Sequence, residues 1–155
     1  MAHVVFVCLG NICRSPMAEG IFNEMIRQRG LKGQITVDSV GTGGWHEGET
    51  AHPGTRQILA EHGITYVGQA RQIQAADLSE ADYLVAMDTS NLNGIKRLGE
   101  THAELFRLLD LVPKAGTKDV PDPYYTGDFE TVYNLVYAGC EALLEKIVQQ
   151  EGLQV

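Results

Sequence analysis

The chain has 155 residues, of which 44% are hydrophobic and 21% are charged, a balance typical of one globular domain with a sizeable core. Its formal net charge of −8 disfavours nucleic acid and anionic membranes as partners, because both bind basic surfaces. The three cysteines form no CxxC pair or zinc-ligand spacing, and the five histidines are scattered. We therefore expect a single cytoplasmic domain, residues 1–155, without a metal or a cofactor.

No targeting or membrane-spanning segment is expected. The first predicted strand begins at His3 without a basic leader before it, and no apolar run approaches the ~18 residues of a membrane helix. The sequence leaves the oligomeric state open, with a monomer as the simplest expectation.

Strand-like and helix-like segments alternate along the chain. The first half predicts, in order, a buried strand, a helix, a second strand, an irregular glycine-rich segment and a helix: His3–Leu9, Pro16–Arg29, Ile35–Val40, Gly41–His52 and Pro53–His62. The second half predicts a third strand at Tyr83–Met87, followed by a short helix that starts at Asp88, Thr89 or Ser90 and ends at Leu98. A fourth strand, a long loop and a final helix follow at Glu104–Leu109, Leu109–Gly127 and Asp128–Gln149. This alternation favours a parallel sheet with helices on both faces, whose ligands bind beyond the carboxyl ends of the strands.

The segment after the first strand carries the most informative motif. It reads Cys-Leu-Gly-Asn-Ile-Cys-Arg, from Cys8 to Arg14, and leads into Ser15 and Pro16. A loop of this length can turn its backbone N–H groups inward to bind an anion, and the following helix adds the partly positive end of its dipole. Arg14 has a planar guanidinium that holds two phosphate oxygens at once. The motif predicts a phosphate cradle with the Cys8 sulfur at its floor.

Cys8 is predicted to be the nucleophile of this cradle, because the positive field favours the thiolate, the attacking form of cysteine. Gly10 is expected to let the backbone approach the ligand and adopt torsions that other residues avoid. Ser15 and Pro16 are expected to be the N-cap and the first residue of the helix. The spacing from Cys8 to Arg14 also occurs by chance around a buried core cysteine, and the strand, the glycine and the Ser-Pro pair weigh against that interpretation.

A proline-rich segment in the second half contains the best candidate for a general acid. Cleavage of a phosphate ester by a thiolate needs an acid for the leaving oxygen and a base for water, and one carboxyl group can serve both steps. Asp122 fits, because Pro121 and Pro123 restrict the backbone on either side of it. Asp119 is the local alternative, and an aspartate before a proline is also a simple turn former.

Together these motifs resemble the low-molecular-weight protein tyrosine phosphatases. The likeness rests on Val7–Pro16 and Asp122–Tyr125, and it extends to Asp38–Thr42, Ala70–Gln72 and Ala86–Asp88, so it covers essentially the whole chain. The resemblance implies a three-layer α/β fold, with a four-stranded parallel sheet, helices on both faces and the Cys-x5-Arg phosphate loop after the first strand. It also implies metal-independent hydrolysis of phosphotyrosine in proteins, and of aryl phosphates, through a phosphocysteine intermediate.

The resemblance also implies the roles of the site residues. Cys8 would be the nucleophile, Arg14 the phosphate ligand and Asp122 the acid and base. The Ser15 hydroxyl would hydrogen-bond the Cys8 sulfur. The substrate phosphate would bind to the loop residues between the cysteine and the arginine: Leu9, Gly10, Asn11, Ile12 and Cys13.

Asn11 would brace the loop, with Ser39 of the second strand as its partner. Family members often carry a histidine two residues before the Ala-Arg-Gln segment, where it helps to hold this asparagine. Gly68 occupies that position in this sequence. We therefore expect the bracing network to be weaker or rerouted.

Aromatic side chains near the motifs are candidates for walls around a phosphotyrosine ring. We expect Trp45, in the glycine-rich segment, and Tyr124, next to Asp122, to form these walls. Core packing is the competing interpretation of Trp45, the only tryptophan. The role of Tyr125 is left open.

The other two cysteines lead to different expectations. The resemblance suggests a disulfide between Cys13 and Cys8 that protects the nucleophile from overoxidation, with an ordinary loop residue as the alternative. Cys140 lies on the apolar stripe of the last helix and is expected in the core.

Two other functions are compatible with a phosphate cradle of this kind. An arsenate reductase on this scaffold relays electrons through two further cysteines near the middle of the chain, but no cysteine lies between Cys13 and Cys140. A phosphocarrier would pass the phosphoryl group on, and it should lack a positioned acid such as Asp122. The sequence therefore favours a phosphatase that acts on phosphotyrosine-containing proteins.

Overall fold

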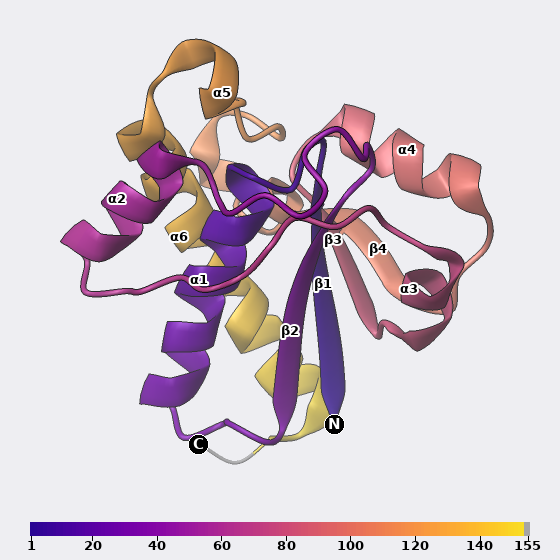
Figure 1. The fold of residues 1–155 in the computed structure, drawn as a ribbon. Coiled ribbons are helices and arrows are strands. Elements are labelled where there is room, and N and C mark those ends of the chain that lie inside the picture. The colour runs from indigo at the N-terminus through magenta and orange to yellow at the C-terminus, as the bar shows by residue number, and fades with distance from the viewer. Residues whose placement is uncertain (154–155) are drawn as a thin grey trace.

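β1 (Ala2–Cys8) is an inner strand of a four-stranded parallel sheet in the order β2-β1-β3-β4 (Figure 1). The computed structural model describes residues 1–153. The other strands are β2 (Ile35–Gly41), β3 (Tyr83–Ala86) and β4 (Glu104–Arg107). The helices are α1 (Arg14–Gln28), α2 (Pro53–Glu61), α3 (Ala75–Glu80), α4 (Thr89–Leu98), α5 (Pro123–Thr126) and α6 (Phe129–Glu151), with the 3-10 helices η1 (Leu108–Leu111) and η2 (Pro113–Ala115).

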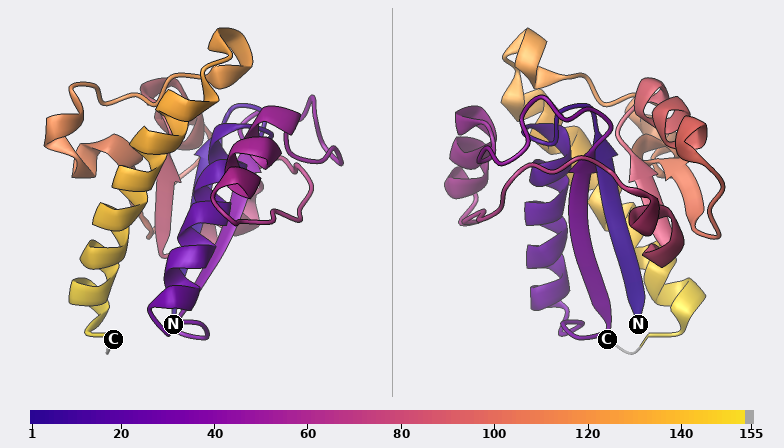
Figure 2. Two further views of the ribbon diagram at one scale, coloured as in Figure 1. Left: turned by 90° about the vertical axis from the view of Figure 1, so that its left-hand side faces the viewer. Right: turned by 45° about the vertical axis from the view of Figure 1, so that its right-hand side comes forward.

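Both faces of β1 are buried, which explains its uninterrupted apolar sequence. Val4 and Phe6 face the layer that contains α1 and α6, where the rings of Phe6 and Phe22 pack edge to face with centroids 5.6 Å apart. Val5 and Val7 face the smaller layer of α3 and α4. Figure 2 shows these two helical layers on opposite sides of the sheet. The predicted three-layer α/β fold is confirmed.

The long C-terminal helix follows the sequence prediction closely. The Asp128 side chain caps α6 by accepting a hydrogen bond from the N–H of Thr131 at 3.1 Å. The apolar stripe of α6 is buried: Val132, Val136, Cys140, Leu143 and Ile147. Cys140 is therefore a core residue, as expected.

Three stretches differ from the sequence prediction. β4 ends at Arg107, because Leu108 and Leu109 turn into η1 and pack against α6, where a Cβ on Gly139 would lie 2.4 Å from Leu108. The sequence does not predict α3, since six residues are too few to show a helical period. The predicted loop 109–127 contains η2 and α5.

The strand order places the end of β1 at a reversal of the topology. The chain moves from β1 to β2 on one side and then to β3 on the other side, so a crevice forms at the carboxyl ends of β1 and β3. Cys8 is the last residue of β1. Figure 1 shows α5 and the segment after β2 at this same end. In residues 1–153, no helix is long and apolar enough to cross a membrane.

Candidate active site

The loop that joins β1 to α1, called the cradle loop below (residues 8–14), is held from outside by its carbonyl groups. The carbonyls of Cys8 and Leu9 each accept a hydrogen bond of 2.9 Å from the backbone of residues 42–43. The Ile12 carbonyl accepts one from the N–H of His52 at 2.7 Å. Since the carbonyls bond to surrounding segments, the N–H groups are left for the interior of the loop.

These N–H groups are available to a ligand. In the described part of the chain, the N–H groups of Gly10, Ile12 and Cys13 have no acceptor. The N–H of Asn11 donates to Cys8 Sγ at 3.3 Å. A ring of unpaired N–H groups beside a helix N-terminus is an anion-binding site, as the motif predicts.

Asn11, and not Gly10, has the unusual backbone torsion of the loop. Its φ of 58° is the only positive φ of a non-glycine residue among residues 1–153, and Gly10 has no positive φ. Asparagine tolerates this conformation when its side chain bonds locally. Gly10 packs closely against the His46 ring, because a Cβ there would lie 3.0 Å from that ring, so a larger residue would require the histidine to shift slightly. The prediction of unusual torsions at Gly10 is therefore wrong.

The start of α1 also differs from the prediction. Its first residue is Arg14 and its N-cap is Cys13, which makes no side-chain cap bond. Ser15 and Pro16 are the second and third helical residues. The Ser15 hydroxyl does not cap the helix, because it bonds Cys8 Sγ at 2.9 Å. The N-terminus of α1 therefore stays open to an anion.

The Cys8 sulfur has two polar neighbours, the Asn11 N–H and the Ser15 hydroxyl. Ser15 Oγ accepts a hydrogen bond from Asn11 Nδ2 at 2.8 Å, so its own proton is directed to the sulfur or to the Val40 carbonyl, which is farther away at 3.4 Å. Asn11 Nδ2 also donates to Ser39 Oγ at 3.0 Å. The Asn11 N–H and the Ser15 hydroxyl can therefore both donate to the sulfur.

The buried Arg14 guanidinium has partners at both terminal nitrogens and none at Nε. Nη1 donates to Asp88 Oδ2 at 2.6 Å and to the Val120 carbonyl at 2.9 Å, while Nη2 lies 3.4 Å from Asp122 Oδ2. Nε is buried and has no partner in residues 1–153. An unpaired buried donor costs about 1–3 kcal/mol, so this N–H is ready for a ligand oxygen. Burial opposes the charge of Arg14, but Cys8, Asp88 and Asp122 outweigh it and raise the pKa of Arg14.

Asp122 faces the same cavity as Cys8. It is the N-cap of α5, and its Oδ1 accepts a hydrogen bond from the N–H of Tyr124 at 3.1 Å. The alternative carboxylate, Asp119, instead accepts two hydrogen bonds of 2.8 Å from Thr89. The geometry therefore favours Asp122 over Asp119 as the acid.

A cavity of about 220 Å³ lies over the cradle loop. Trp45 is 72% exposed and Tyr124 is 51% exposed, so neither belongs to the core and both are free to form walls. Asn11 does not line the cavity, because its side chain braces the loop from behind. The lining residues are Cys8, Leu9, Gly10, Ile12, Cys13, Arg14, Trp45, His46, Asp122, Tyr124 and Tyr125.

Sequence reasoning missed His46 and the second contact of Asp88, and it left the role of Tyr125 open. His46 lines the cavity and pairs with Glu49 at 3.0 Å, and Tyr125 lines it with 76% of its surface exposed. Asp88 was expected only as a helix cap, yet it also holds Arg14. Its place directly after β3, the neighbour of β1, is the signal that could have found it. In residues 1–153, no three His, Cys, Asp or Glu side chains are grouped to hold a metal ion.

The three cysteines are free thiols in different environments. Burial raises the pKa of Cys13 to about 12, with further contributions from the charges of Asp122 and Cys8. Burial also raises the pKa of Cys140. Both groups are therefore neutral thiols at neutral pH.

Iodoacetate at neutral pH is expected to alkylate Cys8 and to leave Cys13 and Cys140 unmodified. The reagent is an anion that the cradle attracts, and it reacts with thiolates only. Peptide mass mapping after brief exposure measures the label, and inorganic phosphate should slow the reaction by occupying the cradle. Label on Cys13 in the wild-type protein would contradict this expectation.

Comparison with known proteins agrees with this geometry. Residues 3–153 match the family described as low molecular weight phosphotyrosine protein phosphatase. The low molecular weight protein-tyrosine-phosphatase YfkJ of Bacillus subtilis is 47% identical over 156 residues, which cover 99% of this chain and 100% of the relative. The crystal structure of YfkJ has a TM-score of 0.94 at 48% identity and covers 97% of this chain and 96% of that one.

A more distant structure carries a different substrate in its name. The crystal structure of DARP, a Drosophila arginine phosphatase, has a TM-score of 0.87 at 31% identity and covers 92% of this chain and 96% of that chain. The family match and the identity to YfkJ extend over nearly the whole chain. This chain therefore belongs to the low molecular weight phosphotyrosine protein phosphatases, enzymes that hydrolyse phosphotyrosine through a phosphocysteine intermediate.

Proposed function

We propose that Cys8, Arg14 and Asp122 carry out phosphotyrosine hydrolysis in this chain. The substrate phosphate binds to the N–H groups of the cradle loop, and the unpaired Nε of Arg14 supplies a further donor. The Cys8 thiolate attacks phosphorus while the Asp122 carboxylic acid protonates the phenolic oxygen. This step breaks the bond between phosphorus and the phenolic oxygen, and it forms phosphocysteine and free tyrosine.

In the second step, the Asp122 carboxylate takes a proton from water, and the water oxygen attacks the phosphocysteine. The bond between sulfur and phosphorus breaks, inorganic phosphate leaves, and the Cys8 thiolate forms again. The Ser15 hydroxyl, 2.9 Å from Sγ, stabilises the sulfur as it departs. The loop N–H groups and Arg14 balance the charge on the transferring oxygens in both steps.

The shape of the cavity supports phosphotyrosine as the side chain that is hydrolysed. We expect its phosphate to bind at the cradle loop and its flat ring to contact Trp45 and Tyr124, which both line the cavity. Phosphoserine lacks the ring that would fill the space between these walls. Phosphoarginine, the substrate that the name of DARP suggests, is the sharper comparison because it has similar length.

The proposal depends above all on one observation, that Cys8, Arg14 and Asp122 line a single cavity. Acid quenching of the protein during turnover of a labelled phosphotyrosine peptide should trap the label on Cys8. Peptides of the same sequence with phosphoserine or phosphoarginine should be hydrolysed more slowly. Label on another residue, or faster hydrolysis of the phosphoarginine peptide, would overturn the assignment.

We propose further that residues 1–155 form one phosphatase domain that works as a cytoplasmic monomer on phosphoproteins. The sheet and both helical layers form from a single continuous stretch, residues 1–153. The unpaired thiols of Cys8, Cys13 and Cys140 suit a reducing compartment. The exposed rings of Trp45 and Tyr125 beside the cavity are accounted for by contact with the substrate.

A further inference from the structure

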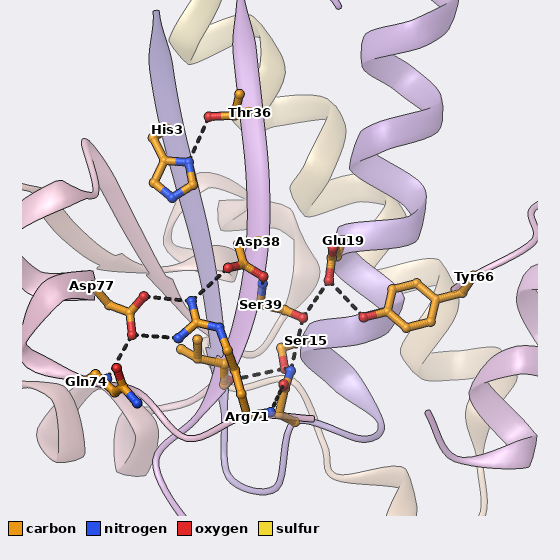
Figure 3. Close-up of polar contacts among 12 residues, drawn as sticks. His3, Ser15, Glu19, Thr36, Asp38, Ser39, Tyr66, Arg71, Gln74 and Asp77 are labelled. Carbon is orange, nitrogen blue, oxygen red and sulfur yellow. Dashed lines mark hydrogen bonds and ion pairs between the residues drawn. The ribbon is translucent and has the colours of Figure 1, made fainter. Parts of the chain in front are cut away.

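The Asn11 side chain sends hydrogen bonds along two arms. One hydrogen of Nδ2 goes to Ser15 Oγ at 2.8 Å, and this oxygen lies 2.9 Å from Cys8 Sγ. The other goes to Ser39 Oγ at 3.0 Å. Ser39 donates in turn to Glu19 Oε1 at 2.6 Å, as Figure 3 shows. One arm therefore ends on the sulfur, and the other ends on a carboxylate.

The direction of these bonds is set at Asn11. The backbone N–H of Arg71 donates to Asn11 Oδ1 at 3.0 Å, and a backbone N–H acts only as a donor. Nδ2 must therefore face the two serines. Because Ser39 accepts a bond from Asn11, its single proton goes to Glu19, whose carboxylate is an acceptor only.

Tyr66 supplies the outer end of the second arm. Its hydroxyl, on the segment between α2 and α3, donates to Glu19 Oε1 at 2.9 Å (Figure 3). Gly68 makes this contact possible, because a Cβ at that position would lie 2.6 Å from Tyr66 Oη. The glycine at the place of the family's frequent histidine thus leaves the space that the tyrosine hydroxyl occupies. In this chain, Glu19 is therefore held by a tyrosine hydroxyl as well as by Ser39.

The charges around Glu19 explain why the second donor matters. Burial, with a smaller contribution from Asp38, raises the pKa of Glu19. The hydrogen bonds from Ser39 and Tyr66, and the charge of Arg71, act in the opposite direction. Loss of the Tyr66 hydroxyl would leave a largely buried carboxylate with one donor fewer, and protonation of Glu19 would weaken its hold on Ser39.

We propose that Tyr66 is a positioning residue for the reaction: by holding Glu19, it keeps Asn11 in the conformation that aims donors at Cys8. The φ of 58° at Asn11 is costly for a residue with a side chain, and such a torsion persists only where its surroundings fix it. The second arm provides one of these fixed points. This inference rests on the proposed role of Cys8 as the nucleophile.

Tyr66→Phe removes the hydroxyl, and Gly68→Ala displaces it. Each variant should lower kcat about three- to tenfold with little change in KM, the range expected for one hydrogen bond. The time profile of Cys8 alkylation by iodoacetate at one fixed pH should become slower, because fewer donors then reach the sulfur. Since both changes break the same contact with Glu19, the double variant should match the single variants.

Tyr83→Phe is the matched control. The Tyr83 hydroxyl donates to Glu151 at 2.8 Å, an equivalent bond at the start of β3, far along the sheet from the cradle. This variant should change neither kcat nor the alkylation profile. The inference is overturned if Tyr66→Phe and Gly68→Ala behave like the control, or lower only the melting temperature. If the wild-type protein is not alkylated at Cys8, the assignment of the nucleophile fails instead.

Discussion

Cys8→Ser is expected to lower turnover by roughly 10⁶-fold, the loss typical of a missing nucleophile, while the fold and the phosphate cradle stay in place. The hydroxyl of a serine is not ionised at neutral pH, so the donors that favour a thiolate do not produce an equivalent alkoxide. The replaced atom lies at the end of a buried strand beside Ser15, and the substitution changes its size little. Release of phosphate from an aryl phosphate measures the effect.

Binding of inorganic phosphate separates lost chemistry from lost structure in this variant. A ligand that binds only the folded state raises the melting temperature, so phosphate should stabilise Cys8→Ser as it stabilises the wild-type protein. A Cys8→Ser protein that is folded, binds phosphate and still turns over substrate would show that Cys8 is not the nucleophile.

Asp122→Asn is expected to slow hydrolysis of a substrate with a poor leaving group by about 10²–10⁴-fold, the usual contribution of a general acid. Asparagine keeps the cap of α5, because its side-chain oxygen also accepts the hydrogen bond from Tyr124, but it has no proton to give. The loss should shrink as the leaving group improves, since a nitrophenolate departs without protonation. A series of aryl phosphates with graded leaving groups measures this trend.

Asp119→Asn tests the local alternative. Asp119 bonds Thr89 and does not line the cavity. In Asp119→Asn, the hydrolysis rate should therefore depend on the leaving group in the same way as in the wild-type protein. A steep loss in Asp119→Asn, together with wild-type behaviour in Asp122→Asn, would reverse the assignment of the acid.

The cradle loop could be predicted because its residues are neighbours in sequence. Cys8 and Arg14 lie on one loop between a strand and a helix, so local spacing alone implies their geometry. Asp122 could be predicted for a different reason, because the prolines on both sides of it restrict the backbone that carries the carboxylate. Trp45 and Tyr124 followed from the need of a ring for aromatic walls, and the structure places both at the cavity.

Contacts between distant segments could not be predicted in the same way. Asp88 holds Arg14 across 74 residues and Tyr66 holds Glu19 across 47. The position of Asp88 at the end of β3 offered a hint of the first pair, but no local pattern encodes the second. The helix start was missed because the Ser15 hydroxyl, a good cap by residue type, is used by the Cys8 sulfur. At Ser15, local preference gave way to a tertiary contact.

The segment after β2 is attached to the cradle loop at both of its ends. Residues 42–43 bond the carbonyls of Cys8 and Leu9, and His52 bonds the carbonyl of Ile12. The stretch between these anchors, residues 44–51, carries Trp45 and forms one side of the cavity. One wall of the cavity therefore lies on a stretch of sequence separate from Cys8, Arg14 and Asp122, whereas Tyr124 directly adjoins the acid. Exchanging this stretch between relatives should change the wall at Trp45 and leave Cys8, Arg14 and Asp122 in place.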